Sequence, residues 1–336
     1  MKNLLYIGNQ LSKKDKTVTI IETLSKLLLE EGYDIVTASK KENKILRLLD
    51  MFSQIIKYRH WVDYVLIDTY STQNFYYAYF CAQLCRLLKL KYIPILHGGD
   101  LPKRLDNSPK LCKTIFNNAH KNVAPSEYLK FKFEESGYHN LVVIPNSIEL
   151  QKYSFKESVF DKPKLLWVRS FAEIYNPSLA IKVLKALIDE KFDAELCMVG
   201  PDKDDSLNKA KALANQFGVD VKFTGKLSKE EWIKRSEDYN IFINTTNFDN
   251  MPVSIIEAMA LGLPIVSTNV GGLPYLIKNN KEGVLLEPNN PKLFVEAIKE
   301  ILAKPEITNT LIWNARNKAE QFDWEIVKNQ WNKLLI

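Results

Sequence analysis

Residues 241–267 read IFINTTNFDNMPVSIIEAMALGLPIVS. Ile241–Asn244 is a short apolar run typical of a buried strand, and a polar loop follows it. Pro252 stands where the first residue of a helix is expected. A second strand is predicted over Pro264–Ser267. This order of strand, helix and strand predicts a parallel βαβ unit.

The same alternation extends in both directions along the chain. In the first half we predict strands at Asn3–Gly8, Tyr33–Ala38, Tyr64–Asp68, Tyr92–Leu96, Asn122–Ala124 and Leu141–Ile144, with helices at Thr17–Glu31, Lys44–Lys57 and Asn74–Leu88. In the second half we predict strands at Leu165–Val168, Ala194–Val199, Val221–Thr224, Ile241–Asn244, Pro264–Ser267 and Gly283–Leu286. The polar segment Glu149–Pro163 is the linker candidate.

Length and composition agree with an α/β protein of two domains. The chain has 336 residues, against about 150 for a usual domain. We place one Rossmann-like, doubly wound domain at 1–155 and another at 156–320, with a cleft between them where ligands meet the strand ends. A content of 46% hydrophobic and 26% charged residues excludes collagen, coiled coil and wholesale disorder.

The chain shows no sign of a signal peptide or of a metal or disulfide framework. No apolar run approaches the roughly 18 residues of a membrane span, and residues 1–10 read as a strand. We therefore expect a cytoplasmic protein. The cysteines lack C-x-x-C spacing and the histidines lack paired ligand spacing, so we expect reduced, buried thiols and no metal cofactor.

The excess of positive over negative charge lies wholly in the first half. Residues 1–155 carry 22 Lys and Arg against 15 Asp and Glu, a net +7, whereas the rest carry 24 against 25, a net −1. Lys40, Lys41, Lys44 and Arg47 crowd the start of an amphipathic segment, Lys40–Arg59, that contains Ile45, Leu48, Leu49, Phe52, Ile55 and Ile56. This segment fits either a core-packing helix with solvated lysines or a helix that contacts an anionic membrane surface. No nucleic-acid-binding motif is present, so we set that partner aside.

The loop after Ile241–Asn244 has the features of an anion site. The helix that begins at Pro252 would present unpaired N–H groups to a phosphate. Asp249 lies in the loop before this helix, and Glu257 lies within it. Two carboxylates beside an anion site fit a ligand with hydroxyl groups on both sides of its phosphates, such as a sugar nucleotide.

This region resembles the Glu-x7-Glu region of the retaining glycosyltransferases of family 4, or glycosyl transferases group 1. Further motifs resemble that family in the family's order: His97-Gly98-Gly99, Ala124-Pro125-Ser126, Ile144-Pro145-Asn146-Ser147, Trp167-Val168-Arg169 and Val199-Gly200-Pro201. The resemblance covers nearly the whole chain. It implies the GT-B fold, in which two Rossmann-like domains face a cleft, and a C-terminal helix at 321–336 that returns to the N-terminal domain.

The resemblance also implies roles for the matching residues. His97 and Asp249 would be catalytic, with His97 near the anomeric centre and Asp249 on the transferred sugar. Arg169 would bind the donor diphosphate, and Glu257 would bind the ribose. Further donor contacts would come from Asn250, Met251, Pro252, Val253 and Ser254, and the acceptor or phosphate loop from Gly8 and Asn9.

The chain departs from the family pattern in three places. Asp249 replaces the usual Glu and is one methylene shorter. The Lys that usually follows the diphosphate-binding Arg falls near Ile174, and the N-terminal Gly-rich loop is reduced to Gly8-Asn9. Asp202-Lys203-Asp204 could be taken for a metal-binding D-x-D, but it opens a helix, where Asp is expected as a cap.

We therefore expect a metal-independent, retaining hexosyltransferase. It would move a sugar from a nucleotide diphosphate-sugar donor to a saccharide or lipid-linked acceptor, in cell-surface polysaccharide biosynthesis and at the inner face of the membrane. Two alternatives stay open: a sugar-nucleotide epimerase or hydrolase of the same fold, and a non-catalytic subunit that binds saccharide or nucleotide-sugar.

Overall fold

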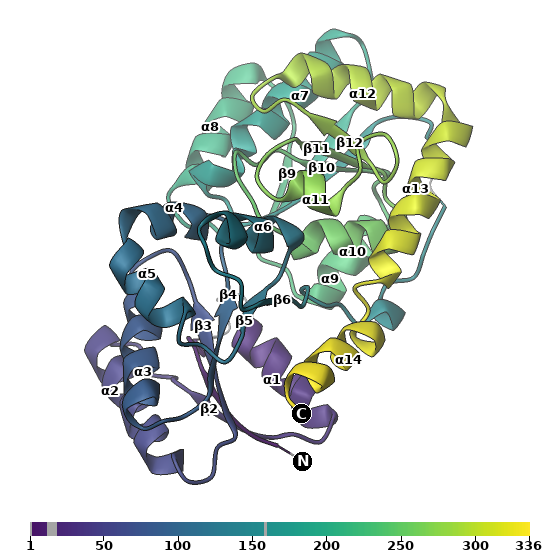
Figure 1. Ribbon diagram of the computed structural model, residues 1–336. Coiled ribbons are helices and arrows are strands. Elements are labelled where there is room, and N and C mark those ends of the chain that lie inside the picture. Colours follow the sequence, from purple (N-terminus) through teal and green to yellow (C-terminus); the bar gives the residue numbers. More distant parts are fainter. Residues whose placement is uncertain (1, 12–18, 158–159) are drawn as a thin grey trace. The chain divides into compact units, whose positions relative to one another are not determined.

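The computed structural model describes residues 2–11, 19–157 and 160–336, which form two compact units (Figure 1). Unit 1 is Met1–Pro145 with Trp324–Ile336, and unit 2 is Asn146–Asp323. The boundaries therefore lie at 145/146 and 323/324, not at 155/156 and 320/321. The reason is local packing, since Ile148, Tyr153 and Phe322 belong to an apolar cluster of unit 2, and the N–H of Ile148 donates to the carbonyl of Phe322 at 2.9 Å.

Unit 1 contains a six-stranded parallel sheet in the order β2-β1-β3-β4-β5-β6. Its strands are β1 (Asn3–Ile7), β2 (Asp34–Ala38), β3 (Tyr64–Thr69), β4 (Tyr92–Leu96), β5 (Asn122–Ala124) and β6 (Leu141–Val143). Its helices are α1 (Ile20–Glu30), α2 (Lys44–Tyr58), α3 (Phe75–Leu87), α4 (Leu101–Asn107), α5 (Pro109–Phe116), α6 (Glu127–Glu135) and α14 (Trp324–Leu334). Residues 17 and 18 of the first predicted helix lie outside the described residues.

Unit 2 contains a second six-stranded parallel sheet, in the order β12-β11-β10-β7-β8-β9. Its strands are β7 (Lys164–Val168), β8 (Glu195–Val199), β9 (Lys222–Gly225), β10 (Ile241–Asn244), β11 (Ile265–Thr268) and β12 (Val284–Leu286). Its α-helices are α7 (Pro177–Asp189), α8 (Ser206–Phe217), α9 (Lys229–Ser236), α10 (Val253–Leu261), α11 (Leu273–Leu276), α12 (Pro291–Ala303) and α13 (Pro305–Glu320). Short 3-10 turns are η1 (Leu150–Lys152) and η2 (Glu173–Tyr175).

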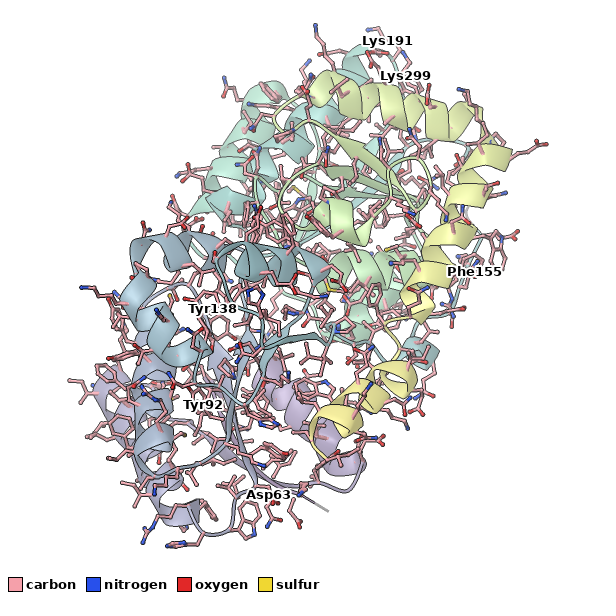
Figure 2. The ribbon with its side chains drawn as sticks, viewed as in Figure 1. Asp63, Tyr92, Tyr138, Phe155, Lys191 and Lys299 are labelled. Carbon is pink, nitrogen blue, oxygen red and sulfur yellow. The ribbon has the colours of Figure 1, made fainter. Side chains whose placement is uncertain are left out.

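Successive strand residues face opposite helical layers, as the period of a buried strand requires. In unit 1, Leu5 packs toward α2 and α3, whereas its neighbour Leu4 packs toward α1 and α14. In unit 2, Leu166 packs toward α10 and α13, and Leu165 toward α7 and α12. Figure 2 shows Tyr92 and Tyr138 inside unit 1, with Lys191 and Lys299 on the outside of unit 2. The four cysteines are free and buried, as predicted.

Helix α2 exposes much of its apolar surface instead of burying it. Ile45 is 71% exposed, and Leu46 and Leu49 are each 56% exposed. The grouping of Arg47 with the solvated basic residues is wrong, because its guanidinium is buried. It donates to the carbonyls of Lys41 (2.7 Å) and Glu42 (2.8 Å) and to the side chain of Asn9 (3.2 Å).

The strand order locates the expected sites. In each sheet the chain starts at a central strand and reverses direction across the sheet, between β1 and β3 in unit 1 and between β7 and β10 in unit 2. Ligands of doubly wound sheets bind outside the carboxyl ends of the strands at such a switch point. Gly8 follows β1 and Arg169 follows β7, so both lie at a switch point.

Candidate active site

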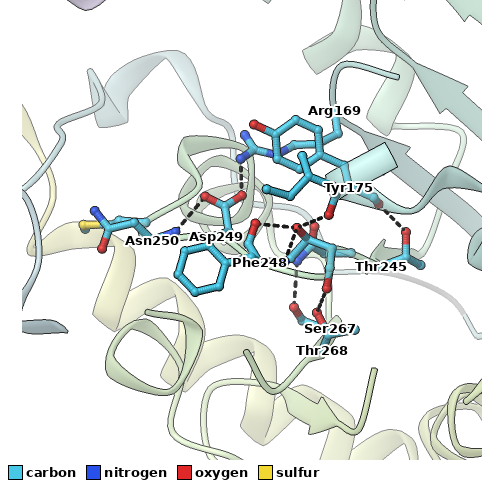
Figure 3. Close-up of polar contacts among 12 residues, drawn as sticks. Arg169, Tyr175, Thr245, Phe248, Asp249, Asn250, Ser267 and Thr268 are labelled. Carbon is cyan, nitrogen blue, oxygen red and sulfur yellow. Dashed lines mark hydrogen bonds and ion pairs between the residues drawn. The ribbon is translucent and has the colours of Figure 1, made fainter. Parts of the chain in front are cut away.

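The loops after β7 and β10 are fastened to each other by buried hydroxyl groups (Figure 3). The indole N–H of Trp167 donates to the hydroxyl of Thr245 at 3.0 Å, and this hydroxyl lies 3.1 and 2.9 Å from the carbonyls of Tyr175 and Asn176. The hydroxyl of Thr268 on β11 donates to the carbonyl of Thr246 at 2.6 Å. These bonds fix the loop at residues 245–252 against the strand ends.

Arg169 and Asp249 form an ion pair through Nη2 and Oδ2, although 80 residues separate them in the sequence. The guanidinium lies over the ring of Tyr175, 4.3 Å from its centroid. Nε of Arg169 is buried and has no hydrogen-bond partner among the described residues, so the guanidinium keeps donor capacity for a ligand. The other oxygen of Asp249 accepts the N–H of Asn250 at 2.8 Å.

A second cation lies near Arg169. Burial, and then the charge of Arg169, lower the pKa of Lys203, which stands between β8 and α8. Its backbone N–H donates to the carbonyl of Phe171 at 2.9 Å, two residues beyond Arg169. Ile174, where the family's Lys is expected, is 45% exposed. Sequence reasoning missed Lys203 because the loop that carries it reads as a helix start.

Two glycines allow the turn before α11 to lie against the Asp249 loop. A Cβ on Gly271 would collide with the carbonyl oxygen of Asp249, and one on Gly272 with that of Asn250. Gly271 also has a φ of +55°, which disfavours a side chain. The Gly-Gly pair thus sets the position of the loop that carries the catalytic candidate.

Gly271→Ala is expected to destabilise the protein more than Gly137→Ala. Gly137 has a φ of +85° but nothing within 4 Å of an added Cβ, so this control carries only the backbone penalty of about 1–2 kcal/mol. The collision with Asp249 should add roughly 1–3 kcal/mol. Urea unfolding of both variants measures the difference; equal destabilisation would mean that the Asp249 loop shifts freely.

Helix α10 begins one residue later than predicted. Pro252 is its N-cap, with an extended backbone, and Val253 is the first helical residue. Val253 and Ser254 are partly buried, and the first turn has N–H groups without partners inside the helix. Asn250 and Met251 are buried, and Met251 packs in the apolar cluster behind α10.

Glu257 is a buried carboxylate with two partners that sequence reasoning missed. Its Oε1 accepts the hydroxyl of Tyr153 at 2.8 Å and forms an ion pair with Lys229, which lie 104 and 28 residues away in the chain. The side chain of Glu257 is 4% exposed. Burial lowers the pKa of Lys229 to about 8.

The remaining predicted residues lie in unit 1. His97 follows β4 and is 4% exposed, with Nε2 2.7 Å from Oδ1 of Asp68. Gly8 packs so closely on Asp68 that a Cβ would collide with the carboxylate. The side-chain oxygen of Asn9 accepts a hydrogen bond from the guanidinium of Arg47. The sequence pattern does not predict this contact.

Asp202 and Asp204 cap a helix start, as the sequence predicts. Asp204 accepts the N–H of Glu173 at 2.9 Å and the hydroxyl of Ser206 at 2.5 Å, and the Ser206 bond lowers its pKa. Asp202 accepts the N–H of Leu207 at 3.3 Å. Within the described ranges, no three His, Cys, Asp or Glu side chains gather as a metal site would require.

Comparison with known proteins matches both halves of the chain. The model of Glycosyltransferase Family 4 matches residues 4–152, and that of Glycosyl transferases group 1 matches residues 151–318. The amylovoran biosynthesis glycosyltransferase AmsK of Erwinia amylovora is 23% identical over 278 residues, which are 78% of this chain and 68% of the relative. Among other curated relatives, the chain spans only 28% and 48% of the length of two.

Solved structures show the same fold. Sucrose-phosphate synthase from Thermosynechococcus elongatus has a TM-score of 0.82 at 16% identity, covering 99% of this chain and 98% of that one. Anabaena HepE in complex with UDP-glucose has a TM-score of 0.79 at 16% identity, covering 100% and 99%. The predicted GT-B class, with two Rossmann-like parallel sheets, is confirmed.

Proposed function

The chain belongs to the glycosyl transferases group 1 family, and on that premise we propose that this glycosyltransferase moves a hexose-type sugar from a nucleotide diphosphate donor to a saccharide or lipid-linked saccharide. The observation that carries the proposal is the Arg169–Asp249 pair at the switch point of unit 2, beside the start of α10. A cation and a helix N-terminus suit a diphosphate, and a carboxylate suits sugar hydroxyls.

Each residue then has a chemical task. Arg169 and the N–H groups of α10 stabilise the charge that develops on the leaving diphosphate. Asp249 holds the transferred sugar, and Glu257 holds the ribose. The anomeric configuration is retained, with the leaving diphosphate helping to deprotonate the acceptor hydroxyl. The relative named for amylovoran biosynthesis supports a role in cell-surface polysaccharide synthesis.

A thermal-shift screen of nucleotide diphosphate-sugars tests donor binding. A ligand that binds only the native state stabilises it by about 2.7 kcal/mol at 100 times its Kd. This stabilisation raises the melting temperature. We expect one nucleotide class to raise it, and Arg169→Met to abolish the shift. No shift with any nucleotide would contradict the proposal.

We propose that transfer needs no metal ion. The cations available to the diphosphate are Arg169 and, nearby, Lys203, and backbone N–H groups add neutral hydrogen-bond donors. Activity is therefore expected to survive prolonged treatment with EDTA and to be unchanged when Mg²⁺ or Mn²⁺ is restored. A strict dependence on either ion would overturn this assignment.

We further propose that unit 1 contacts an anionic membrane at the cytoplasmic face through α2. Lys40, Lys41 and Lys44 are exposed beside the apolar side chains of Ile45, Leu46 and Leu49. Basic residues attract anionic headgroups, and exposed apolar groups can enter the boundary with the acyl chains. No helix among the described residues is long and apolar enough to span a bilayer.

Reversing Lys40, Lys41 and Lys44 to Glu should abolish sedimentation with phosphatidylglycerol vesicles. Each basic residue near such a surface contributes about 1 kcal/mol, so removing three weakens binding by more than roughly 100-fold. Arg47 is left intact because it is buried. The control reverses the exposed Lys182, Lys211 and Lys292 of unit 2 and should sediment like the wild type. Equal sedimentation of both triple variants would rule out α2 as the contact.

A further inference from the structure

The ion pair between Glu257 and Lys229 joins two helices of unit 2. Glu257 lies in the second turn of α10, and Lys229 is the first residue of α9, where a capping box between Ser228 and Glu231 holds the backbone. Both helices follow strands of one parallel sheet, β9 and β10, and Trp232 of α9 packs in the same apolar cluster as α10. The pair therefore lies toward the carboxyl ends of the strands, where doubly wound sheets bind ligands.

Lys229 stands where a positive charge is unfavourable. The first turn of a helix carries the positive end of the helix dipole, which disfavours a cation there. Burial is the main cause that lowers the pKa of Lys229, and the charge of Lys152 lowers it further, although Glu230 and Glu149 act in the opposite direction. A lysine held at this position against burial and the helix dipole indicates a role beyond the stability of α9.

The carboxylate and the ammonium both keep unused hydrogen-bonding capacity. The hydroxyl of Tyr153 and Nζ of Lys229 both bond to Oε1 of Glu257, so Oε2 has no partner among the residues that the structure describes. Oε2 is not among the fully buried unpaired atoms of these residues, so it reaches the surface of unit 2. An ammonium has three N–H groups, of which Lys229 uses one on Glu257, and the Lys229 side chain is 43% exposed.

A free acceptor and free donors therefore lie side by side, because Oε1 and Oε2 belong to one carboxylate and Nζ of Lys229 contacts Oε1. A carboxylate oxygen only accepts and an ammonium only donates. Two hydroxyl groups on adjacent carbons satisfy both, since one can donate to Oε2 of Glu257 while the other accepts from Nζ of Lys229. The ribose of a ribonucleotide carries such a diol at its 2′ and 3′ positions, and a deoxyribose does not.

We propose that Lys229 is a specificity-determining residue that binds one hydroxyl of a ribose diol while Glu257 binds the other. The inference rests on the proposed function, which places the donor ribose at Glu257. It adds a second residue with the opposite hydrogen-bonding role, so that the site requires both hydroxyls. Donors built on a ribonucleotide should therefore be preferred to their 2′-deoxy and 3′-deoxy analogues.

Calorimetric titration of the full chain tests this selection without any turnover. The probes are UDP, GDP and ADP, each with its 2′-deoxy and 3′-deoxy analogue. The wild type should bind the ribonucleotide of one base about 10- to 100-fold more tightly than either analogue, because each missing hydroxyl removes a bond to a charged group. If either analogue bound the wild type as tightly as the ribonucleotide, only one hydroxyl would be bound and the proposal would be overturned.

Lys229→Met assigns the second hydroxyl, because methionine keeps an apolar stem but donates no hydrogen bond. This variant should bind one of the two analogues within about twofold of the ribonucleotide and still discriminate against the other. The matched control is Lys152→Met, which removes a nearby lysine from an ion pair with Glu149 and should leave both preferences unchanged.

The possible failures of the inference and of the proposed function are distinguishable. If Lys229→Met kept both preferences, Lys229 would be only a structural partner of Glu257, and the inference would be overturned while the proposed function stood. The same loss of preference in Lys152→Met would assign the effect to general electrostatics and would also overturn the inference. If no nucleoside diphosphate bound the wild type, the proposed function would fail and the inference with it.

Discussion

Arg169→Met is expected to lower kcat/KM by about 100- to 1,000-fold. Loss of one preorganised donor to a developing charge costs this much in enzymes whose transition states gain negative charge. Here the charge develops on the leaving diphosphate, which Arg169 is proposed to bind. Methionine keeps the apolar stem over the ring of Tyr175 but removes the guanidinium. Steady-state kinetics with the donor found in the thermal-shift screen measures the loss.

Two further variants separate this effect from loss of a surface charge. Arg169→Lys keeps one charge but not the planar fork, so it should retain about a tenth of the activity. Arg235→Met removes an arginine from an exposed ion pair with Asp238 in the same unit, and it should leave kcat/KM unchanged. A comparable loss in Arg169→Met and Arg235→Met would mean that general electrostatics, not a diphosphate contact, controls the rate.

Substitutions of Asp249 and Glu257 are expected to change different kinetic constants. Asp249 is proposed to hold the sugar, which gains positive charge as its bond to phosphate opens, so Asp249→Asn should lower kcat. A hydrogen bond to a charged group contributes about 1.5–3 kcal/mol, which predicts a loss of roughly 10- to 100-fold. Glu257 is proposed to hold the ribose equally in the ground and transition states. Glu257→Gln should therefore raise KM and leave kcat nearly unchanged.

Asp249→Glu is the matched control, because it restores the family's usual residue while keeping the charge. It should retain much of the activity if the loop at residues 245–252 accommodates one methylene. Asp249 pairs with Arg169 and Glu257 bonds to Tyr153, so each substitution also alters a structural contact. Thermal unfolding of each variant checks that the protein is still folded. If Glu257→Gln lowered kcat while Asp249→Asn only raised KM, the donor would lie in the reverse orientation.

The strands were predictable because their signal is local. All twelve named strands begin and end within one residue of their predicted limits, since a parallel strand covered on both faces is a short, continuous apolar run. Pro252 was placed one position too far into α10. Its fixed φ suits the N-cap as well as the first helical turn, so the sequence does not distinguish the two.

The contacts within the site were not predictable, because they join residues that are distant in sequence. Asp68 and His97 are 29 residues apart, and Tyr153 and Glu257 are 104 apart. Arg47 illustrates the opposite error. An arginine among lysines at a helix start reads as solvated, but carbonyl groups of residues 41 and 42 lie within reach of its guanidinium, so the side chain is buried.

The most direct test of the central claim is a transfer assay with the identified donor, run with and without saccharide acceptors, on the wild type and Arg169→Met. We expect release of the nucleoside diphosphate only when an acceptor is present, a product whose anomeric configuration matches the donor by NMR, and a loss of at least 100-fold in Arg169→Met. Release without acceptor would instead indicate a hydrolase or epimerase. Tight donor binding without turnover would indicate a binding subunit, and either result would contradict the account.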